Sequence, residues 1–188
     1  MFAVNSSIVY IVITVVFAAI VIAAVVSIIL RRTKHQRAIK KLISDLSRDC
    51  LRNIFLPDGI DGEVWVDGVL LTDGGLIVLD IRDYTGNLFG GEVINEWTQL
   101  ISGRSHKFSN PLMEMSTRVQ AVQSLVEVPV KGCVVFTHRG RFPKNIPQGA
   151  SMIDETFEQQ SHFLRPALPE PSLEKAWLQI TTLAKQGL

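Results

Sequence analysis

The chain has 188 residues, which is enough for one domain with a hydrophobic core and one additional segment. Its 19 basic and 18 acidic side chains leave a net charge of +1, and this balance excludes the strong basic excess of a dedicated nucleic-acid-binding protein. The two cysteines belong to no CxxC or Cys/His pattern, which argues against a structural zinc site.

The N-terminal segment is the most apolar part of the chain. Residues 8–30 contain no charged side chain, no proline and no glycine, and about 20 apolar residues allow a helix to cross a bilayer. The run lacks the basic start of a cleavable signal peptide and is longer than the apolar core of one. Basic side chains follow the run instead, at positions 31, 32, 34, 37, 40 and 41.

The positive charge after the apolar run sets the expected topology. Because basic flanking segments stay in the cytoplasm, we expect residues 1–7 to form a short extracytoplasmic N-terminus and residues 8–30 a single transmembrane helix. Residues 31–41 then form a basic juxtamembrane segment, which contacts anionic lipid headgroups of the bilayer. The predicted location is the cell membrane (inner or plasma membrane), with the soluble domain in the cytoplasm.

A helix and a hairpin come next in chain order. Between residues 34 and 51, apolar side chains recur with the 3.6-residue period of an amphipathic helix. Residues 53–62 contain proline and glycine and indicate a connection. Two apolar runs, 63–71 and 75–83, flank the sequence TDGG, whose Asp-Gly pair is typical of the two-residue turn of a β-hairpin.

The following segment combines glycine-bearing loops with a third strand. Residues 84–91 are predicted as a loop with room for a short strand, residues 96–102 as a strand, and residues 103–109 as a loop. Asn110 and Pro111 then predict the start of a helix, because asparagine is a good N-cap and proline suits the first helical position.

That helix is expected to end near position 126. Residues 130–137 are predicted as a buried strand, and residues 138–149 as a basic, proline-rich loop. Residues 151–188 are expected to pack on the same domain as helices at 155–164 and 171–186, after an edge strand at 150–154. This order predicts an α/β fold with a mixed sheet flanked by helices. It is not a Rossmann domain, since no predicted strand is followed by GxGxxG.

The hairpin places two acidic side chains opposite each other. If the Asp-Gly pair forms the loop, paired residue numbers sum to 147, and Asp67 faces Asp80 on one face of the sheet. Arg82 projects from that face because it lies two positions from Asp80, and Trp65 is opposite Arg82. These four side chains are predicted to form one polar corner.

Directly opposed carboxylates repel each other, so a further group must stabilise the pair. Mg²⁺ is one candidate, because it binds through one or two carboxylates together with water and phosphate oxygens. Arg82 alone is a second candidate, since arginine is a usual partner of a buried carboxylate. Protonation of one aspartate is the third. The residue spacing leaves all three open and favours the arginine.

The hairpin and its surroundings resemble a known family. The string GEVWVDGVLLTDGGLIVLDIRDYTGNLFGG, followed by Trp97, Phe108 and an NPL helix start, resembles the nuclease-related domain (NERD) family. That family is similar to the PD-(D/E)XK nuclease-like superfamily. The resemblance covers about residues 34–137, and we expect the domain to occupy residues 34–150. It implies a restriction-endonuclease-like α-β-β-β-α-β core after the transmembrane helix.

The resemblance also implies roles for the hairpin residues. Asp67 matches an aspartate that binds metal in active relatives, and Asp80 matches the acidic residue of the family's E-x-K motif, the second ligand. Arg82 matches the lysine of that motif, which positions or activates the attacking water. The implied catalytic residues are therefore Asp67, Asp80 and Arg82, with Mg²⁺ as the cofactor.

This sequence departs from the family pattern at the same positions. Aspartate in place of glutamate at 80 shortens the arm by one methylene, and arginine in place of lysine at 82 removes a group that can lose its proton. Gln36 lies near a position where the family has glutamate, and Glu114 stands where it often has glutamine. These two residues and Trp65 are the accessory candidates.

Two functions follow from the resemblance. In the first, a membrane-anchored Mg²⁺-dependent nuclease hydrolyses phosphodiester bonds of DNA or RNA, and basic side chains contact the phosphates. In the second, the degenerate site is weakly active or inactive, and the domain is a binding or scaffold module with a membrane protein as its partner. The altered positions favour the second. The phosphate-binding candidates are Arg104, Lys107, Arg139, Arg141 and Lys144.

Overall fold

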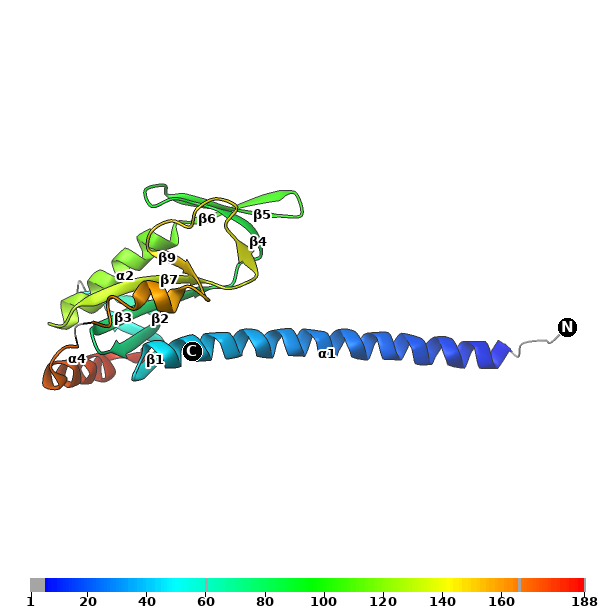
Figure 1. Ribbon diagram of the computed structural model, residues 1–188, viewed down its shortest axis with the longest axis horizontal. Helices are drawn as coiled ribbons and strands as arrows, with labels where there is room; N and C mark the ends of the chain where they lie inside the picture. Colours follow the sequence, from blue (N-terminus) through cyan, green and yellow to red (C-terminus); the bar gives the residue numbers. More distant parts are fainter. Residues whose placement is uncertain (1–5, 60, 166, 188) are drawn as a thin grey trace. The chain divides into compact units, whose positions relative to one another are not determined.

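The computed structural model describes residues 6–59, 61–165 and 167–187 (Figure 1). Inside the first helix, the side chains at positions 6–9, 11, 12, 14, 28, 29 and 31–35 are also outside the described part. The chain divides into two compact units, Met1–Lys40 and Lys41–Leu188. The strands of the described chain all lie in the second unit.

The first helix is longer than either helix predicted for this region. α1 (Ser6–Leu46) runs without a break for 41 residues, through the predicted transmembrane and amphipathic segments. Among the residues that the structure describes, no helix has a stretch long and apolar enough to cross a membrane. Residues 1–5 of the predicted extracytoplasmic segment 1–7 lie outside the described residues, as do several side chains of the predicted span 8–30.

A six-stranded mixed sheet forms the centre of the second unit. Its strand order is β10-β1-β2-β3-β7-β9, with β3, β7 and β9 parallel to one another and the remaining pairs antiparallel. This confirms the predicted α/β class with a mixed sheet. The strands are β1 (Asp49–Pro57), β2 (Glu63–Thr72), β3 (Gly75–Arg82), β7 (Val130–Phe136), β9 (Ala150–Met152) and β10 (Lys185–Gln186).

Strand β1 corrects the prediction of a helix up to residue 51 and a connection over 53–62. α1 ends at Leu46, and Asp49–Pro57 pairs antiparallel with β2 along its length. Leu42 and Leu46 are buried at helical spacing, whereas Ile54 and Leu56 are buried at the two-residue spacing of a strand. Short apolar runs fit both the helical period and the strand period, so the local pattern does not distinguish the two. The pairing with β2 makes this segment a strand.

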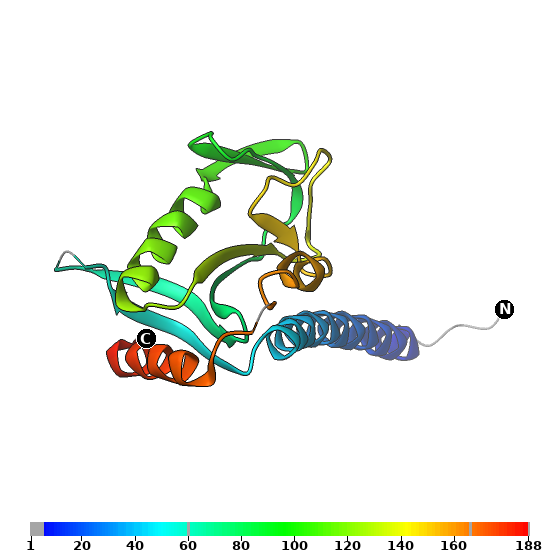
Figure 2. The same ribbon diagram turned by 60° about the vertical axis from the view of Figure 1, so that its left-hand side comes forward.

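A smaller four-stranded sheet lies at the end of the unit away from α4 (Figures 1 and 2). Its order is β6-β5-β4-β8. The predicted third strand is confirmed by β5, but the predicted loop over 103–109 is wrong, because these residues form β6. Ser102 and Gly103 have φ of 48° and 79°, as a tight two-residue hairpin turn requires. The strands are β4 (Gly86–Phe89), β5 (Glu96–Ile101), β6 (Arg104–Ser109) and β8 (Gly140–Arg141).

Three further helices complete the described part of the second unit, which also includes the end of α1. α2 (Pro111–Leu125) begins as predicted, since the Asn110 side chain accepts a hydrogen bond from the Leu112 N–H at 2.9 Å. α2 packs on β7, β3 and β2, while α4 packs on β1 and α2 (Figure 2). The predicted C-terminal helices are present but shorter, as α3 (Thr156–Gln160) and α4 (Glu170–Leu183), and the chain then pairs with β1 as β10.

An aromatic cluster joins the two sheets. The Trp97 ring of β5 stacks on Phe136 of β7, with ring centroids 5.9 Å apart, and both side chains are fully buried. Phe108 and Phe142 meet the same indole edge-on. A Cβ at Gly90 would lie 2.2 Å from the Trp97 ring, so only glycine leaves room for the indole there. The two sheets therefore share one core.

Candidate functional site

The predicted register of the hairpin is confirmed. β2 and β3 pair from Thr72–Gly75 to Gly68–Leu79, so that paired residue numbers sum to 147. The pairing ends one position before Asp67. There the Asp67 Oδ2 accepts a hydrogen bond from the Ile81 N–H at 3.0 Å, in place of a backbone carbonyl.

Asp67 has an arginine partner that the sequence did not indicate. Arg52 of β1 donates from Nη2 to Asp67 Oδ1 at 2.6 Å and from Nε to the Asp67 carbonyl at 2.9 Å. The Arg52 chain crosses Gly68, where an added Cβ would lie 3.1 Å from Arg52 Cδ. Both carboxylate oxygens of Asp67 are thus engaged within the chain.

Asp80 is the most deeply buried charged group of the hairpin, with a side chain only 3% exposed. Arg82 donates to Asp80 Oδ2 from Nε at 2.9 Å and from Nη2 at 2.7 Å. Arg118 of α2 donates to the same oxygen from Nη1 at 2.8 Å. One buried carboxylate oxygen therefore binds two guanidinium groups.

Glu114 closes the arrangement from the solvent side. Its Oε2 accepts a hydrogen bond from Arg82 Nη2 at 2.5 Å and lies 3.6 Å from Arg118 Nη2, one helical turn along α2. Each arginine therefore lies between a buried and a partly exposed carboxylate. We call Asp80, Arg82, Glu114 and Arg118 the four-residue cluster.

The environment of Arg82 keeps its guanidinium charged. Burial acts against the charged form, but the hydrogen bonds and negative charge of Asp80, and then of Glu114, outweigh it and raise the pKa of Arg82. An arginine already keeps its proton in proteins, so Arg82 cannot accept a proton from an attacking water. It acts as a fixed cation.

Trp65 reaches the four-residue cluster through Arg118. The guanidinium carbon lies 5.4 Å from the centroid of the partly exposed indole, and Arg118 Nε donates to the Trp65 carbonyl at 3.0 Å. The indole N–H donates to Asn53 Oδ1 at 2.9 Å. Trp65 thus fixes Arg118, and this arginine links Trp65 with Asp80. The hydrogen bonds of Asp67 go to Arg52 and the Ile81 N–H instead, so the structure joins only part of the predicted polar corner.

The carboxylates as arranged do not fit the Mg²⁺ that the family resemblance implies. Mg²⁺ needs carboxylate oxygens that are free to enter its coordination shell. Asp80 Oδ2 and Glu114 Oε2 accept guanidinium N–H groups, and Asp67 binds Arg52 and a backbone N–H. Within the described part of the chain, no group of three His, Cys, Asp or Glu residues could hold a metal ion.

The remaining predicted residues are on other elements than those of the four-residue cluster. Gln36 is exposed on α1 in the first unit. Arg104 and Lys107 are on β6, at one edge of the four-stranded sheet, and Arg141 is on β8 at the other edge. Two of the predicted phosphate contacts have acidic partners, in the pairs Lys107–Glu96 at 2.9 Å and Arg139–Asp83 at 2.6 Å. Lys144 is exposed between β8 and β9.

Sequence reasoning missed Arg52 and Arg118. Arg118 follows Glu114 by four positions on the helix that starts at Asn110, and such pairs meet on one helix face. That spacing was a usable signal. Arg52 gave no signal, because it lies between a predicted helix that ends at residue 51 and a predicted connection over 53–62, whereas the structure has a strand there beside Asp67.

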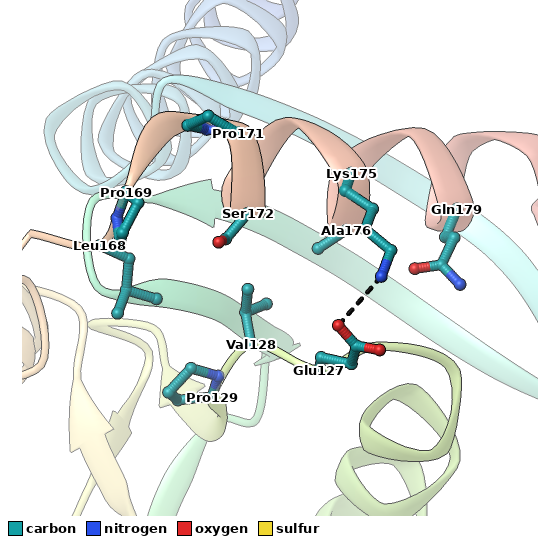
Figure 3. Close-up of a pocket in the computed structure, with 10 residues that line it drawn as sticks. All are labelled: Glu127, Val128, Pro129, Leu168, Pro169, Pro171, Ser172, Lys175, Ala176 and Gln179. Atoms are coloured by element: carbon teal, nitrogen blue, oxygen red, sulfur yellow. Dashed lines mark hydrogen bonds and ion pairs between the residues drawn. The ribbon is translucent and has the colours of Figure 1, made fainter.

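A pocket of about 420 Å³ lies elsewhere in the second unit (Figure 3). It is formed by residues 127–129 and the first turns of α4, and the Glu127–Lys175 ion pair at 3.0 Å spans it. No residue of the four-residue cluster lines this pocket. Its lining is Glu127, Val128, Pro129, Leu168, Pro169, Pro171, Ser172, Lys175, Ala176 and Gln179.

Comparison with known proteins identifies the family. The family model of the nuclease-related domain matches residues 31–137, which is more than half of the chain and includes the whole four-residue cluster. An uncharacterised protein of Bacillus anthracis is 24% identical over 95 residues, covering 49% of this chain and 45% of the relative, so the chain spans less than half of that protein. No solved structure matches the chain. The chain belongs to the nuclease-related domain family.

Proposed function

We propose that this protein is a non-catalytic nuclease-related module that serves as a binding or scaffold surface at the cytoplasmic face of a membrane. One observation carries the proposal: guanidinium groups of the chain itself bind the carboxylates that the resemblance assigns to metal. Arg52 binds Asp67, while Arg82 and Arg118 bind Asp80.

The chemistry of hydrolysis explains why this observation matters. A metal-dependent nuclease uses its cation to generate a nucleophilic water and to stabilise charge on the phosphorus centre. In the four-residue cluster, two carboxylates and two guanidiniums cancel in charge, and Arg82 cannot remove a proton. Such an arrangement supports a stable, charge-balanced surface better than a phosphodiester-cleaving centre.

A cleavage assay tests the proposed function. The full chain in detergent is expected to cleave neither DNA nor RNA in millimolar Mg²⁺ or Mn²⁺ above the rate of Asp67→Asn and Asp80→Asn, because guanidinium groups of the chain already bind these carboxylates. The alternative is a Mg²⁺-dependent nuclease that acts on DNA or RNA at the membrane. Metal-dependent cleavage that both substitutions abolish would establish that alternative and overturn the proposal.

We further propose that residues 8–30 anchor the module as a single-pass helix, with the basic residues 31–41 on the cytoplasmic side. The charge-free sequence supports this, although part of the segment lies outside the described side chains. Described apolar residues of α1, such as Ile13, Phe17 and Ile20, are exposed, and lipid would cover them.

Extraction of membranes tests the anchor. The full chain is expected to stay in the membrane pellet after alkaline carbonate treatment and to dissolve in detergent, because carbonate releases proteins held only by ionic contacts. Replacing Phe17 and Ile20 by arginine should release the protein, since each charge in the span costs about 3 kcal/mol. Release of the unsubstituted chain by carbonate would rule out a spanning anchor.

A further inference from the structure

We propose that Arg82 and Arg118 form a binding site for a small phosphate group, and that the Glu114 carboxylate occupies this site as a displaceable intramolecular ligand. The inference rests on the proposed non-catalytic function and names a ligand class for it. The ligand is inorganic phosphate or a small phosphomonoester.

The two guanidiniums are held rigidly from behind. Both donate to the buried Asp80 Oδ2, at 2.7 Å from Arg82 Nη2 and 2.8 Å from Arg118 Nη1. Arg118 is fixed further by the Trp65 carbonyl and ring. Donors held in place before binding lose little conformational freedom when an anion arrives, which is the condition for a strong site.

Glu114 is held much less firmly than Asp80. Its side chain is 36% exposed, against 3% for Asp80, and its contacts in the cluster are with the two guanidiniums. An exposed carboxylate can turn into water at small cost, since partly exposed ion pairs contribute little to stability. Asp80 cannot leave, because a buried carboxylate without its partners is strongly disfavoured. Glu114 is therefore the displaceable member.

The charges fit a phosphate group once Glu114 has turned away. The cluster is neutral with Glu114 in place, since two negative and two positive charges cancel. With Glu114 in water, the two arginines and Asp80 leave one positive charge. A phosphomonoester carries about −1.5 to −2 near neutral pH and accepts the same N–H donors as a carboxylate.

The exposure of the arginines limits the size of the ligand. With Glu114 in place, Arg82 is 20% and Arg118 is 12% exposed, so the opening to both donor groups is the space that the Glu114 carboxylate leaves when it turns away. A single terminal oxyanion can enter where Glu114 Oε2 now lies. A phosphodiester within a polymer carries a substituent on each side and fits such an opening poorly. This favours a free phosphate or a small monoester.

Occupation of the site by the Glu114 carboxylate determines how a substitution of this residue should change the phosphate affinity. A ligand that must displace a group present about nine-tenths of the time binds about tenfold more weakly than it would to the open site. Glu114→Gln keeps the shape of the side chain but removes its charge. It should therefore bind inorganic phosphate about tenfold more tightly than the unsubstituted chain.

Calorimetric titration of the full chain in detergent with inorganic phosphate, at constant ionic strength, tests this inference. Glu127→Gln is the matched control, because it removes the carboxylate from the exposed Lys175 pair outside the cluster and should leave phosphate affinity unchanged. Adding Arg118→Gln to Glu114→Gln should abolish the gain. If that double variant does not fold, Arg118→Lys replaces it and should reduce the gain, because a point charge lacks the paired donors.

Equal phosphate affinity in Glu114→Gln and the unsubstituted chain, or an equal gain in Glu127→Gln, would overturn the inference. Either result leaves the proposed function standing, because that function is tested by metal-dependent cleavage of nucleic acid. Conversely, metal-dependent cleavage by the unsubstituted chain would overturn the proposed function whatever the phosphate titration gives.

Discussion

Asp80→Asn is expected to lower the free energy of unfolding by about 3 kcal/mol, because it leaves two partly buried guanidiniums without the anion that anchors them. The side chain keeps its size, so the loss reports charge rather than packing. Asp80 Oδ2 accepts hydrogen bonds from both Arg82 and Arg118. An asparagine oxygen can accept from the same donors but carries no charge to offset theirs. Glu114 still neutralises one arginine, which limits the cost.

Urea unfolding of the full chain, monitored by tryptophan fluorescence, measures this loss. The urea concentration at the midpoint of unfolding should be lower for Asp80→Asn than for the unsubstituted chain. Glu127→Gln is the control, because it removes one charge from an ion pair with Lys175 that is largely exposed on both sides. Exposed pairs contribute little, so the control should unfold near the original midpoint. Equal midpoints for Asp80→Asn and the control would show that the buried carboxylate does not anchor the cluster.

Trp97→Ala is expected to cost about 3–5 kcal/mol, since it removes a fully buried indole and leaves a cavity between the two sheets. The lost contacts include the stacked ring of Phe136 and the edge-on ring of Phe142. The indole N–H also donates to the Gly91 carbonyl at 3.0 Å, which ties β5 to the loop before it. The four-stranded sheet should loosen before the six-stranded sheet does.

Chemical denaturation together with amide hydrogen exchange separates these two effects. Phe157→Ala is a suitable control, because it truncates an aromatic ring that is 44% exposed. The control should unfold near the original midpoint, while Trp97→Ala should unfold earlier and show faster exchange in β4, β5 and β6. If amide exchange in Trp97→Ala became faster to the same extent in both sheets, the indole would not be the contact that joins the four-stranded sheet to the six-stranded sheet.

The parts of the fold that sequence predicted well are those with local causes. The Asp73-Gly74 turn fixes the register of β2 and β3, because a two-residue loop leaves one way of pairing the flanking residues. The start of α2 is equally local, since the Asn110 side chain bonds an N–H two residues further along. In both places the deciding contact joins residues that are near neighbours in the chain.

The parts that were predicted wrongly depend on distant partners. β1 is a strand because β2 pairs with it, and β6 is a strand because β5 does. A short apolar segment such as the one around Leu51 fits a helical stripe or a strand when only the local pattern is considered. The turn of the second hairpin is Ser102-Gly103, a weaker signal than Asp-Gly.

The sequence by itself determined that Asp67, Asp80 and Arg82 belong to one hairpin with a known register, since side chains alternate along a strand and pair across a two-residue turn. The tertiary structure decided which cation each carboxylate meets. Arg52 arrives with β1, and Arg118 arrives with α2 together with Glu114. The partner of a buried charge is the group that tertiary packing places beside it. The packing of a helix on a sheet is determined by apolar contacts between residues far apart in the chain, and local residue spacing does not reveal it.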